Sequence, residues 1–323
     1  MEEQTTKVMV TGGAGFIGSH LVDELVRHGR RITVYDNLST GFLRHLDSAK
    51  SSGRVEIVEG DILDSAKLTA AMEGVSTVFH LAANADVRGG IADTYVDLEQ
   101  NVIGTHRVLE AMRSVGATEM VFTSSATVYG EPHDFPTRED YTPLQTSLYG
   151  ASKLAAEALI QAYGEYFGIR SHSFRFVSWI GERYSHGVVY DFIKKLRENP
   201  TELEILGDGN QKKSYLHVED GVRGIFLALD GMTEPKNIIN LGHVEYMKVT
   251  DLADIVCEEM GLKNVSYRFT GGARGWLGDS PFVHLDISKI SRAGFQPRVS
   301  IEEGIRRTAR YLLGNPWLLE GRG

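Results

Sequence analysis

The stretch from Val8 to Asp36 places the strongest constraint on how this chain can fold. A short apolar run is followed at once by glycines at positions 12, 13, 15 and 18, then by an amphipathic run and a second apolar run. This order predicts a strand, a tight turn, a helix and a second strand. Gly12 permits the turn, Gly15 leaves room for a diphosphate at the free N–H groups of the helix start, and Gly18 permits close packing. The stretch therefore predicts a dinucleotide site.

Asp36 ends the second of these strands, where its carboxylate can accept hydrogen bonds from both hydroxyls of an adenosine ribose. The same charge would repel a 2′-phosphate, so the sequence favours NAD over NADP. Clusters of glycines are common in loops, and a plain turn is the alternative. The second strand and its terminal acid favour the nucleotide. A further acid, Asp61, follows the strand expected over Val55–Glu59 and could face the adenine.

Composition narrows the class of protein. At 323 residues the chain is long enough for one large or two unequal domains. Its 34 basic and 43 acidic residues give a net charge of −9 without long blocks of one sign, so nucleic acid is not an expected partner. The single cysteine, Cys257, lies in an apolar run and is expected to be a packed thiol.

The sequence also allows predictions about targeting signals and membrane spans. The acidic start MEEQTTK leads straight into a strand, so we expect no signal or transit peptide. No run of about eighteen apolar residues occurs, so we expect no membrane span. A cytoplasmic location follows as the default expectation.

Apolar runs alternate with helical runs through the first half of the chain. The apolar runs are 8–10, 31–35, 55–59, 77–81 and 119–123, with a sixth at 170–175. Runs of helical spacing include 64–72, 94–115 and one that begins at Tyr149. The alternation predicts an α/β fold with a doubly wound parallel sheet of the Rossmann type. The loop AANADVRGG, after 77–81, is then expected to line the ligand crevice.

The pattern changes after about residue 186. Helical runs at 187–198, 219–231, 249–260, 286–293 and 300–313 alternate with short strands such as 204–206 and 237–241. We predict a NAD-binding Rossmann domain over 1–186 and a smaller C-terminal α/β domain over 187–323 that binds the substrate. The boundary is soft, because segments within 219–241 can return to the main sheet.

Tyr149 and Lys153 carry the predicted chemistry. They lie four positions apart in a helical run, so their side chains share a face. A tyrosine is a weak base at its usual pKa of about 10. A nearby ammonium and a cationic nicotinamide would favour its phenolate, which could take the proton of a sugar hydroxyl while hydride leaves the same carbon for NAD. Ser125 would hydrogen-bond that oxygen, and Lys153 would also hold the nicotinamide ribose. The alternative is a helix in which both side chains are merely buried.

The sequence predicts the roles of several histidines and of one arginine less specifically. We expect His80 to be a buried histidine with satisfied nitrogens and His217 to brace its loop. Arg183 and His186 either contact the sugar or stabilise their own loop. No group of His, Cys and Asp has the spacing of metal ligands, so no metal is predicted.

The motifs TGGAGFIG, HLAA, NVIGT, SSATVYG, YGASK and GDGNQKKSYLHVED occur in this order. On these motifs, residues 7 to 312 resemble the extended short-chain dehydrogenases, and within them the nucleotide-sugar epimerases of the NAD-dependent epimerase/dehydratase family, typified by UDP-glucose 4-epimerase. The resemblance implies tightly held NAD, oxidation of the sugar at C4, rotation of the 4-keto sugar, and return of hydride to its opposite face. The resulting prediction is a 4-epimerase of a UDP-hexose.

The resemblance also assigns roles to residues. Those implied for the cofactor are Gly12, Gly15, Phe16, Ile17, Asp36, Asn37, Asp61, Ile62, Leu81, Ala82, Ala83, Asn101, Thr123, Tyr149, Lys153 and Phe176. Those implied for the substrate are Ser125, Ser178, Arg183, Lys213, Tyr215, Arg274 and Asp279. The implied catalytic residues are Ser125, Tyr149 and Lys153.

A homodimer is also implied, since relatives pair the helices that correspond to 94–115 and 149–167. Apolar positions that could form its seam, or could equally face the sheet, are Val108, Ala111, Leu154 and Ala158.

The sequence departs from these relatives at informative positions. Dehydratases and decarboxylases carry an acid where this chain has Ala126, which argues against both reactions. Lys213 replaces the usual arginine of the diphosphate site and offers a point charge in place of a bidentate fork. Trp276 replaces a second arginine, and Arg274 could supply the lost charge.

Two further positions concern the sugar. Val283 stands where relatives carry a gate, and a small gate would admit an N-acetyl group at C2. Ser178 stands where an asparagine often contacts substrate.

Other functions on the same fold remain open. One is a nucleotide-sugar 4-ketoreductase or 4,6-dehydratase, and another is a non-catalytic protein that binds NAD. A reductase would consume added cofactor, whereas an epimerase would not.

Overall fold

The computed structural model describes residues 6–320. Within these residues the chain divides into two compact units, of which the first contains the described residues up to 128 together with 147–175 and 228–239, and the second contains 129–146, 176–227 and the described residues from 240 onward. This division differs from the predicted single boundary after residue 186, because late segments return to the first unit. The predicted roles of the two units stay predictions. The start of MEEQTTK, from which we expected no signal peptide, lies outside the described residues.

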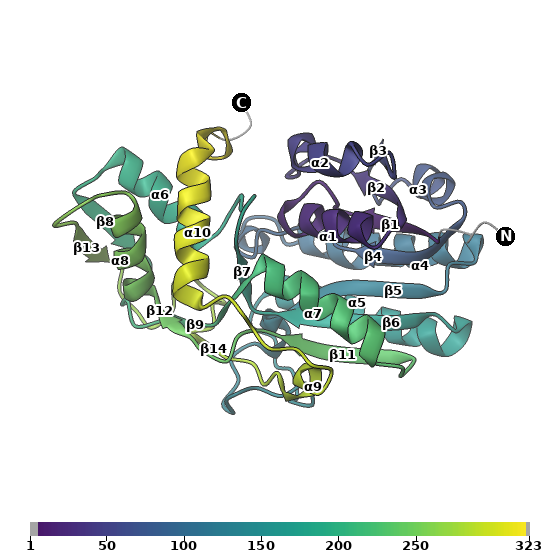
Figure 1. Cartoon of the computed structure of the whole chain (residues 1–323). Coiled ribbons are helices and arrows are strands. Elements are labelled where there is room, and N and C mark those ends of the chain that lie inside the picture. The colour runs from purple at the N-terminus through teal and green to yellow at the C-terminus, as the bar shows by residue number, and fades with distance from the viewer. Residues whose placement is uncertain (1–5, 321–323) are drawn as a thin grey trace. The chain divides into compact units, whose positions relative to one another are not determined.

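A seven-stranded sheet has the order β11-β6-β5-β4-β1-β2-β3. Figure 1 shows these strands stacked in that order, from β3 at the top to β11 at the bottom. Their bounds are β1 Lys7–Thr11, β2 Arg31–Asp36, β3 Val55–Glu59, β4 Val75–His80, β5 Glu119–Ser125, β6 Arg170–Phe176 and β11 Lys236–Leu241. Parallel registers join β1 to β2 and β4, β2 to β3, and β4 to β5. The predicted Rossmann-type α/β fold is confirmed, and β11, which lies in the region 219–241, is a strand of this sheet.

The helices of the first unit begin and end where local chemistry stabilises them. They are α1 Phe16–Arg27, α2 Asp47–Lys50, α3 Ser65–Ala71, α4 Gly104–Val115 and α5 Leu148–Phe167, with 3-10 turns at Leu43–Leu46, Gly89–Ile91 and Ala126–Tyr129. In α5, the Ser147 side chain accepts a hydrogen bond from the Gly150 N–H, and Gly168 ends the helix in a left-handed conformation. A serine hydroxyl and a glycine thus set the two ends of the helix that carries Tyr149.

The helix predicted over 94–115 is only partly correct. Residues Leu98–Ile103 form a π-helical segment, η3, and the regular helix α4 starts at Gly104. A Cβ on Gly104 would lie 2.5 Å from Cδ1 of Ile62, so this glycine lets the start of α4 approach the loop after β3. π-Helical turns are rare and are frequent at functional sites.

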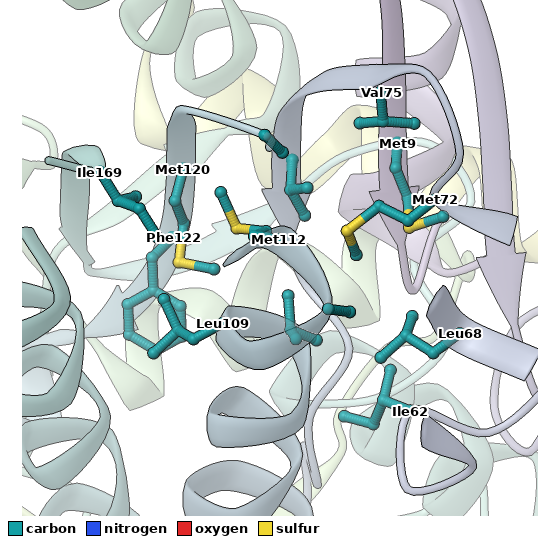
Figure 2. Close-up of a cluster of buried hydrophobic side chains, with 14 of the residues drawn as sticks. Met9, Ile62, Leu68, Met72, Val75, Leu109, Met112, Met120, Phe122 and Ile169 are labelled. Carbon is teal, nitrogen blue, oxygen red and sulfur yellow. The ribbon is translucent and has the colours of Figure 1, made fainter. Parts of the chain in front are cut away.

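A core of buried apolar side chains joins the sheet to the helices of the first unit (Figure 2). The sheet supplies residues such as Met9 and Phe122, and the helices supply residues such as Leu109 and Met112. Val108 and Ala111, which we placed either in a dimer seam or against the sheet, belong to this core and face the sheet. Ala158 is exposed and Leu154 is half-buried, so only these two of the four positions stay available for a seam.

The second unit consists of small sheets and helices. Its strands are β7 Ser178–Ile180, β8 Glu202–Ile205, β9 Lys212–Lys213, β10 Tyr215–His217, β12 Met247–Lys248, β13 Ser266–Phe269 and β14 Phe282–Val283. β10 pairs with β7, β13 pairs with β8, and β9 lies between β12 and β14. Its helices are α6 Val188–Glu198, α8 Val249–Glu259, α9 Ser288–Ser291 and α10 Ile301–Gly314, together with most of α7 Val218–Gly231. The helix expected over 286–293 is thus a single short turn.

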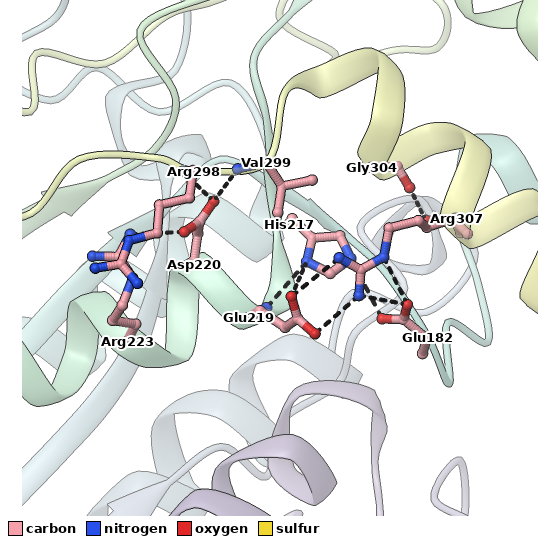
Figure 3. Close-up of polar contacts among 10 residues, drawn as sticks. Glu182, His217, Glu219, Asp220, Arg223, Arg298, Val299, Gly304 and Arg307 are labelled. Carbon is pink, nitrogen blue, oxygen red and sulfur yellow. Dashed lines mark hydrogen bonds and ion pairs between the residues drawn. The ribbon is translucent and has the colours of Figure 1, made fainter.

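A polar cluster connects α10 to β10 and to the loop after β7 (Figure 3). His217 Nδ1 accepts a hydrogen bond from the Glu219 N–H at 3.3 Å, and His217 Nε2 lies 3.4 Å from a Glu182 oxygen. Arg307 of α10 donates to both carboxylates. The prediction that His217 braces its loop is confirmed.

Between residues 6 and 320, no helix combines the length and the apolar character needed to cross a bilayer.

Candidate active site

The glycine turn after β1 has the geometry that a bound dinucleotide requires. Gly12 has a φ of +70°, and a Cβ there would lie 2.8 Å from the backbone nitrogen of Ala82. A Cβ on Gly18 would collide with the carbonyl oxygen of Gly12. Glycine at these two positions therefore lets β1, the start of α1 and the loop after β4 come together.

The start of α1 is open to an anion. Gly15 is its N-cap and supplies no side-chain hydrogen bond. A Cβ on Gly15 would approach only the Gly12 carbonyl, at 3.2 Å, and would otherwise stand in open space. Backbone N–H groups at a helix start attract phosphates. The first unit thus offers a cradle that a side chain would fill, which fits the diphosphate of NAD. Phe16 and Ile17, the next predicted cofactor residues, form the first turn of α1.

Asp36 lies at the end of β2 and is held by backbone donors. Its Oδ2 accepts from Ala14 N and its Oδ1 from Leu38 N, both at 2.8 Å. Each carboxylate oxygen can accept further hydrogen bonds, so the ribose assignment remains open to Asp36. Asp36 also anchors the glycine turn through Ala14, a structural role that we did not predict.

The structure brings Asn37 and Asp61 together, since Asn37 Nδ2 donates to Asp61 Oδ2 at 2.9 Å. Asp61 Oδ1 accepts from Leu63 N at 2.9 Å. Ile62, which follows Asp61 in the predicted cofactor set, points its side chain into the core. It therefore packs the first unit together, whatever its backbone contacts.

His80 fixes the loop that carries Leu81, Ala82 and Ala83. Its Nε2 lies 3.0 Å from Thr105 Oγ1, and its Nδ1 lies 2.8 Å from Thr11 Oγ1. Because the Thr105 hydroxyl donates to the Asn101 carbonyl, it must accept from His80 Nε2–H. Burial, with a contribution from Lys153, lowers the pKa of His80 to about 3, so the ring is neutral. The predicted satisfied histidine is confirmed.

Ser125, Tyr149 and Lys153 meet at the end of β5. The Ser125 side chain lies close enough to the Tyr149 phenol to act toward a lower pKa of that group. Lys153 Nζ donates to the Thr123 carbonyl at 3.0 Å and lies 5.8 Å from the centre of the Tyr149 ring. Helix α5 brings Tyr149 and Lys153 to one side, and β5 delivers the serine. The first unit alone therefore assembles a hydroxyl, a phenol and an ammonium.

The chain's own groups do not favour the phenolate of Tyr149, so the predicted phenolate depends on the charge of the nicotinamide and stays a prediction. Burial, reinforced by the charge of Asp97, raises the pKa of Tyr149 to about 12, although the hydrogen bond from Ser125 opposes this. Burial lowers the pKa of Lys153 to about 8, against the opposing charges of Asp97 and Glu157. An added positive charge at the phenol is therefore what a phenolate at this position needs, and a cationic nicotinamide has that charge.

A buried ion pair between Glu157 and Arg175 lies next to the Ser125, Tyr149 and Lys153 group, and we did not predict it. Glu157 lies one turn after Lys153 on α5 and is 1% exposed. Its carboxylate receives Arg175 Nε at 3.0 Å and Nη2 at 2.8 Å, and it accepts the Ser124 hydroxyl at 2.5 Å. In the sequence, the i, i+4 spacing of Lys153 and Glu157 could have indicated that Glu157 lies on the same face of the helix as Lys153.

In the second unit, Lys213 and Asp279 form an ion pair. Lys213 Nζ lies 2.5 Å from Asp279 Oδ1 and 4.6 Å from the centre of the Trp276 ring. Asp279 Oδ2 accepts from Gly275 N at 3.1 Å. Tyr215 is buried next to this pair, and burial together with the charge of Asp279 raises its pKa. The structure thus brings together three predicted substrate residues around the indole that replaces an arginine.

Arg274 already has a carboxylate partner, because it forms an ion pair with Glu131. Sequence reasoning missed Glu131, which lies 143 residues away along the chain and has no motif. The charges of Lys213 and Arg274 are thus balanced by Asp279 and Glu131.

The remaining predicted residues of the second unit differ in their settings. Ser178 is exposed at the start of β7, and Phe176 is buried with its ring centre 4.4 Å from that of Trp179. Arg183 has a φ of +64°, a left-handed conformation that costs energy in a residue other than glycine. Strain of this kind is concentrated at ligand sites, which makes Arg183 of interest.

Comparison with known proteins gives consistent results. A putative UDP-glucose 4-epimerase from Methanocaldococcus jannaschii is 34% identical, with 95% of this chain and 99% of that protein covered. A crystal structure of a UDP-galactose 4-epimerase is 37% identical, with a TM-score of 0.87 and coverage of 97% of this chain and 100% of the other.

A dTDP-glucose 4,6-dehydratase from Streptomyces venezuelae, solved with NAD bound, is 29% identical, with a TM-score of 0.89 and coverage of 97% and 98%. Epimerases and dehydratases thus resemble this chain to a similar degree. Residues 8–242 match the model of the NAD dependent epimerase/dehydratase family. With the glycine cradle and the Ser125, Tyr149 and Lys153 group in place, the chain is a NAD-dependent member of that epimerase/dehydratase family.

Proposed function

We propose that this protein is a NAD-dependent 4-epimerase of a UDP-hexose. The observation that carries the proposal is that Ser125, Tyr149 and Lys153 are all present while the residue directly after Ser125 is Ala126, which has no carboxylate. A dehydratase needs an acid and a base to eliminate water, and the residues after Ser125 are an alanine and a threonine. Thr127 donates its hydroxyl to Ser125 Oγ at 2.9 Å, so it orients the serine and supplies no carboxylate.

Tyr149 takes the proton from the C4 hydroxyl of the sugar, and Ser125 donates a hydrogen bond to the C4 oxygen as it becomes a carbonyl. Lys153 keeps positive charge near the phenolate. NAD supplies the hydride acceptor at C4 and later the hydride donor. Rotation of the 4-keto sugar between the two transfers inverts C4 without net redox change, and Tyr149 returns the proton.

The residues proposed to hold NAD are those of the glycine turn, Asp36 with Asn37 and Asp61, the loop 81–83, and Lys153. Thr123 is proposed to support the NAD site indirectly, because its carbonyl accepts a hydrogen bond from Lys153. Asn101, which lies in the π-helical segment η3, is also proposed to support this site. In the second unit, Lys213, Tyr215, Arg274 and Asp279 are proposed to bind the nucleotide, and Ser178 and Arg183 the sugar. Phe176 is proposed to lie beside the cofactor.

A coupled assay with UDP-glucose and UDP-galactose tests the proposal. We expect interconversion without added NADH and no lasting absorbance of reduced nicotinamide. Tyr149→Phe is expected to remove turnover by a factor of at least about 100, because it removes the general base. Consumption of NADH in proportion to product would instead indicate a ketoreductase. Release of water to give a 4-keto-6-deoxy sugar would indicate a dehydratase, and full turnover by Tyr149→Phe would reject the assigned base.

Val283 is the residue proposed to decide which sugars the protein accepts. It pairs with Lys213 between strands β14 and β9. We propose that this small residue admits UDP-N-acetylhexoses. Val283→Tyr is expected to lower kcat/KM for UDP-N-acetylglucosamine by at least about tenfold while leaving UDP-glucose turnover within about twofold. Equal losses on both sugars, or no wild-type turnover of the acetylated sugar, would reject the gate.

We further propose a homodimer and a cytoplasmic location. Support for the dimer comes from the family resemblance, with Leu154 and Ala158 as remaining seam positions. Support for the location is the single cysteine, buried and unpaired with another. Sedimentation and cell fractionation test the two proposals.

A further inference from the structure

A buried carboxylate close to the proposed active site has no role in the chemistry given above. Asp97 precedes the π-helical segment η3 and is 1% exposed. A Cβ on Gly90 would lie 2.7 Å from Asp97 Oδ2, so a glycine leaves the room that this carboxylate occupies. Among residues 6–320, Oδ2 has no hydrogen-bond partner. Burial of a carboxylate is costly, which calls for a compensating role.

Asp97 is the start of a chain of hydrogen bonds that ends at Tyr149. Its Oδ1 accepts from Asn84 Nδ2 at 2.9 Å and from Asn101 Nδ2 at 3.2 Å. Asn101 Oδ1 accepts from Asn84 N at 2.8 Å, and Asn101 Nδ2 also donates to Ser152 Oγ at 2.9 Å. Ser152 in turn donates to the Tyr149 carbonyl at 2.7 Å. The chain thus joins the loop after β4, the π-helical turn and the first turn of α5.

This arrangement constrains the first turn of α5 from outside the helix. Ser147 caps the same turn at its start, and Ser152 ties it to Asn101. A catalytic phenol must be held within about half an ångström of its productive position. Each asparagine amide can orient the next group only if Asp97 fixes it, because an amide has two nearly equivalent orientations.

We propose that Asp97 is a positioning residue, whose carboxylate anchors Asn84 and Asn101 and through Ser152 holds Tyr149 and Lys153 in register. This inference rests on the proposed function. It assigns to Asp97 no contact with the sugar or with the reacting atoms.

The charge of Asp97 has a second, separable effect. The charged and titratable groups around it are Asp86 on its own side, and Tyr149 and Lys153 on α5, with Glu157 and His80 facing Lys153. The negative charge of Asp97 raises the pKa of Tyr149, so its removal lowers that pKa. A neutral residue of the same shape should therefore extend activity toward lower pH.

Two substitutions separate geometry from charge. Asp97→Asn keeps an acceptor oxygen but removes the charge, and the acid limb of its kcat profile is expected to move to lower pH by about one unit. Asp97→Ala removes the acceptor, and its kcat is expected to fall at least about tenfold at every pH, with KM changing less than about threefold. Asp93→Asn, the same change at an exposed carboxylate outside the loop 82–90, should leave both quantities at their wild-type values.

A double-mutant cycle tests the path. If Asp97 acts through Ser152, the losses in Asp97→Ala and Ser152→Ala will be strongly non-additive. Hydrogen exchange of the Asn84 and Asn101 side-chain amides, labelled with 15N and assigned with Asn84→Ala and Asn101→Ala, needs no substrate. We expect at least about tenfold faster exchange in Asp97→Ala than in the wild type.

The outcomes can be told apart. No wild-type turnover of any UDP-hexose would reject the proposed function and leave the exchange measurement to decide on Asp97. Wild-type kcat, pH profile and amide exchange in both Asp97 variants would overturn the positioning role. A lower melting temperature with an unmoved pH profile in Asp97→Asn would also overturn it, in favour of a purely structural residue.

Discussion

Glu157 and Arg175 show how a single buried pair can support a reactive group without contacting it. Both side chains are almost fully buried, and Glu157 also holds Ser124, the neighbour of Ser125. Desolvation makes such a pair costly to form, but removing one partner leaves the other charge uncompensated. The pair is therefore sensitive to single changes and tolerant of a matched double change.

We predict that Glu157→Gln lowers the free energy of unfolding by about 3–5 kcal/mol, because it leaves Arg175 buried without its counter-charge. The double variant Glu157→Leu with Arg175→Met is expected to recover at least half of that loss. Urea unfolding monitored by circular dichroism measures both. A single variant as stable as the wild type, or a double variant worse than the single, would contradict this account.

At the scale of elements, the start of α4 depends on the absence of a side chain. Gly104→Ala places a Cβ against Ile62 Cδ1 and is expected to lower the unfolding free energy by about 1–3 kcal/mol through overpacking. Ile62→Val removes that Cδ1, so the double variant should lose less than the sum of the single variants. Gly314→Ala, at a helical glycine with open space around it, is the matched control and should not be destabilising.

The loop that carries Arg274 leads to a prediction about binding. Glu131 neutralises Arg274, and a diphosphate would have to compete with it. Glu131→Gln is expected to lower the Kd for UDP by about three- to tenfold at low salt, with the gain reduced at 0.5 M NaCl. Glu139→Gln, a carboxylate in the same segment, serves as the control. Unchanged or weaker binding of UDP to Glu131→Gln in a calorimetric titration would show that Arg274 does not meet the phosphates.

Local sequence patterns allowed most helices and strands to be predicted, but not the places where a helix becomes irregular. Apolar runs located the strands of the main sheet within a few residues because parallel strands are buried on both faces. The π-helical segment η3 left no trace in the spacing of 94–115, because the groups that contact this stretch, such as Ile62 at Gly104 and Asn84 at Asn101, come from other segments. Lys213 and Asp279 were each predicted from their motifs as substrate residues, but their ion pair was not. Glu131, Glu157 and Asp97 owe their roles to partners that only the fold brings near.

At the scale of the whole molecule, acid stability can be predicted from the cluster of Figure 3. Burial raises the pKa of Glu182, but hydrogen bonds from His217, its own backbone and Arg307 outweigh this and lower it to about 2 from 4.5. A carboxyl with a depressed pKa stabilises the fold above its unfolded pKa, and this stability disappears as the pH falls from about 4.5 to about 2.

Glu182→Gln is therefore expected to lower the melting temperature at pH 7, with the difference from wild type shrinking toward pH 3. Glu198→Gln, at an exposed position of the same unit, is the control and should show little difference at either pH. Calorimetric scans at several pH values measure the effect. A difference that grows as the pH falls would contradict the role of the Glu182 carboxylate.

Strand β11 occupies the border of the main sheet beside β6, yet β6 ends at residue 176 and β11 begins only at residue 236, so β11 is made much later in the order of synthesis. While it is absent, β6 presents unpaired backbone groups along an open edge, a surface on which chains associate. A fragment ending near residue 186 should accordingly be insoluble when produced alone, and a nascent chain on the ribosome should need shielding until residue 241 has emerged.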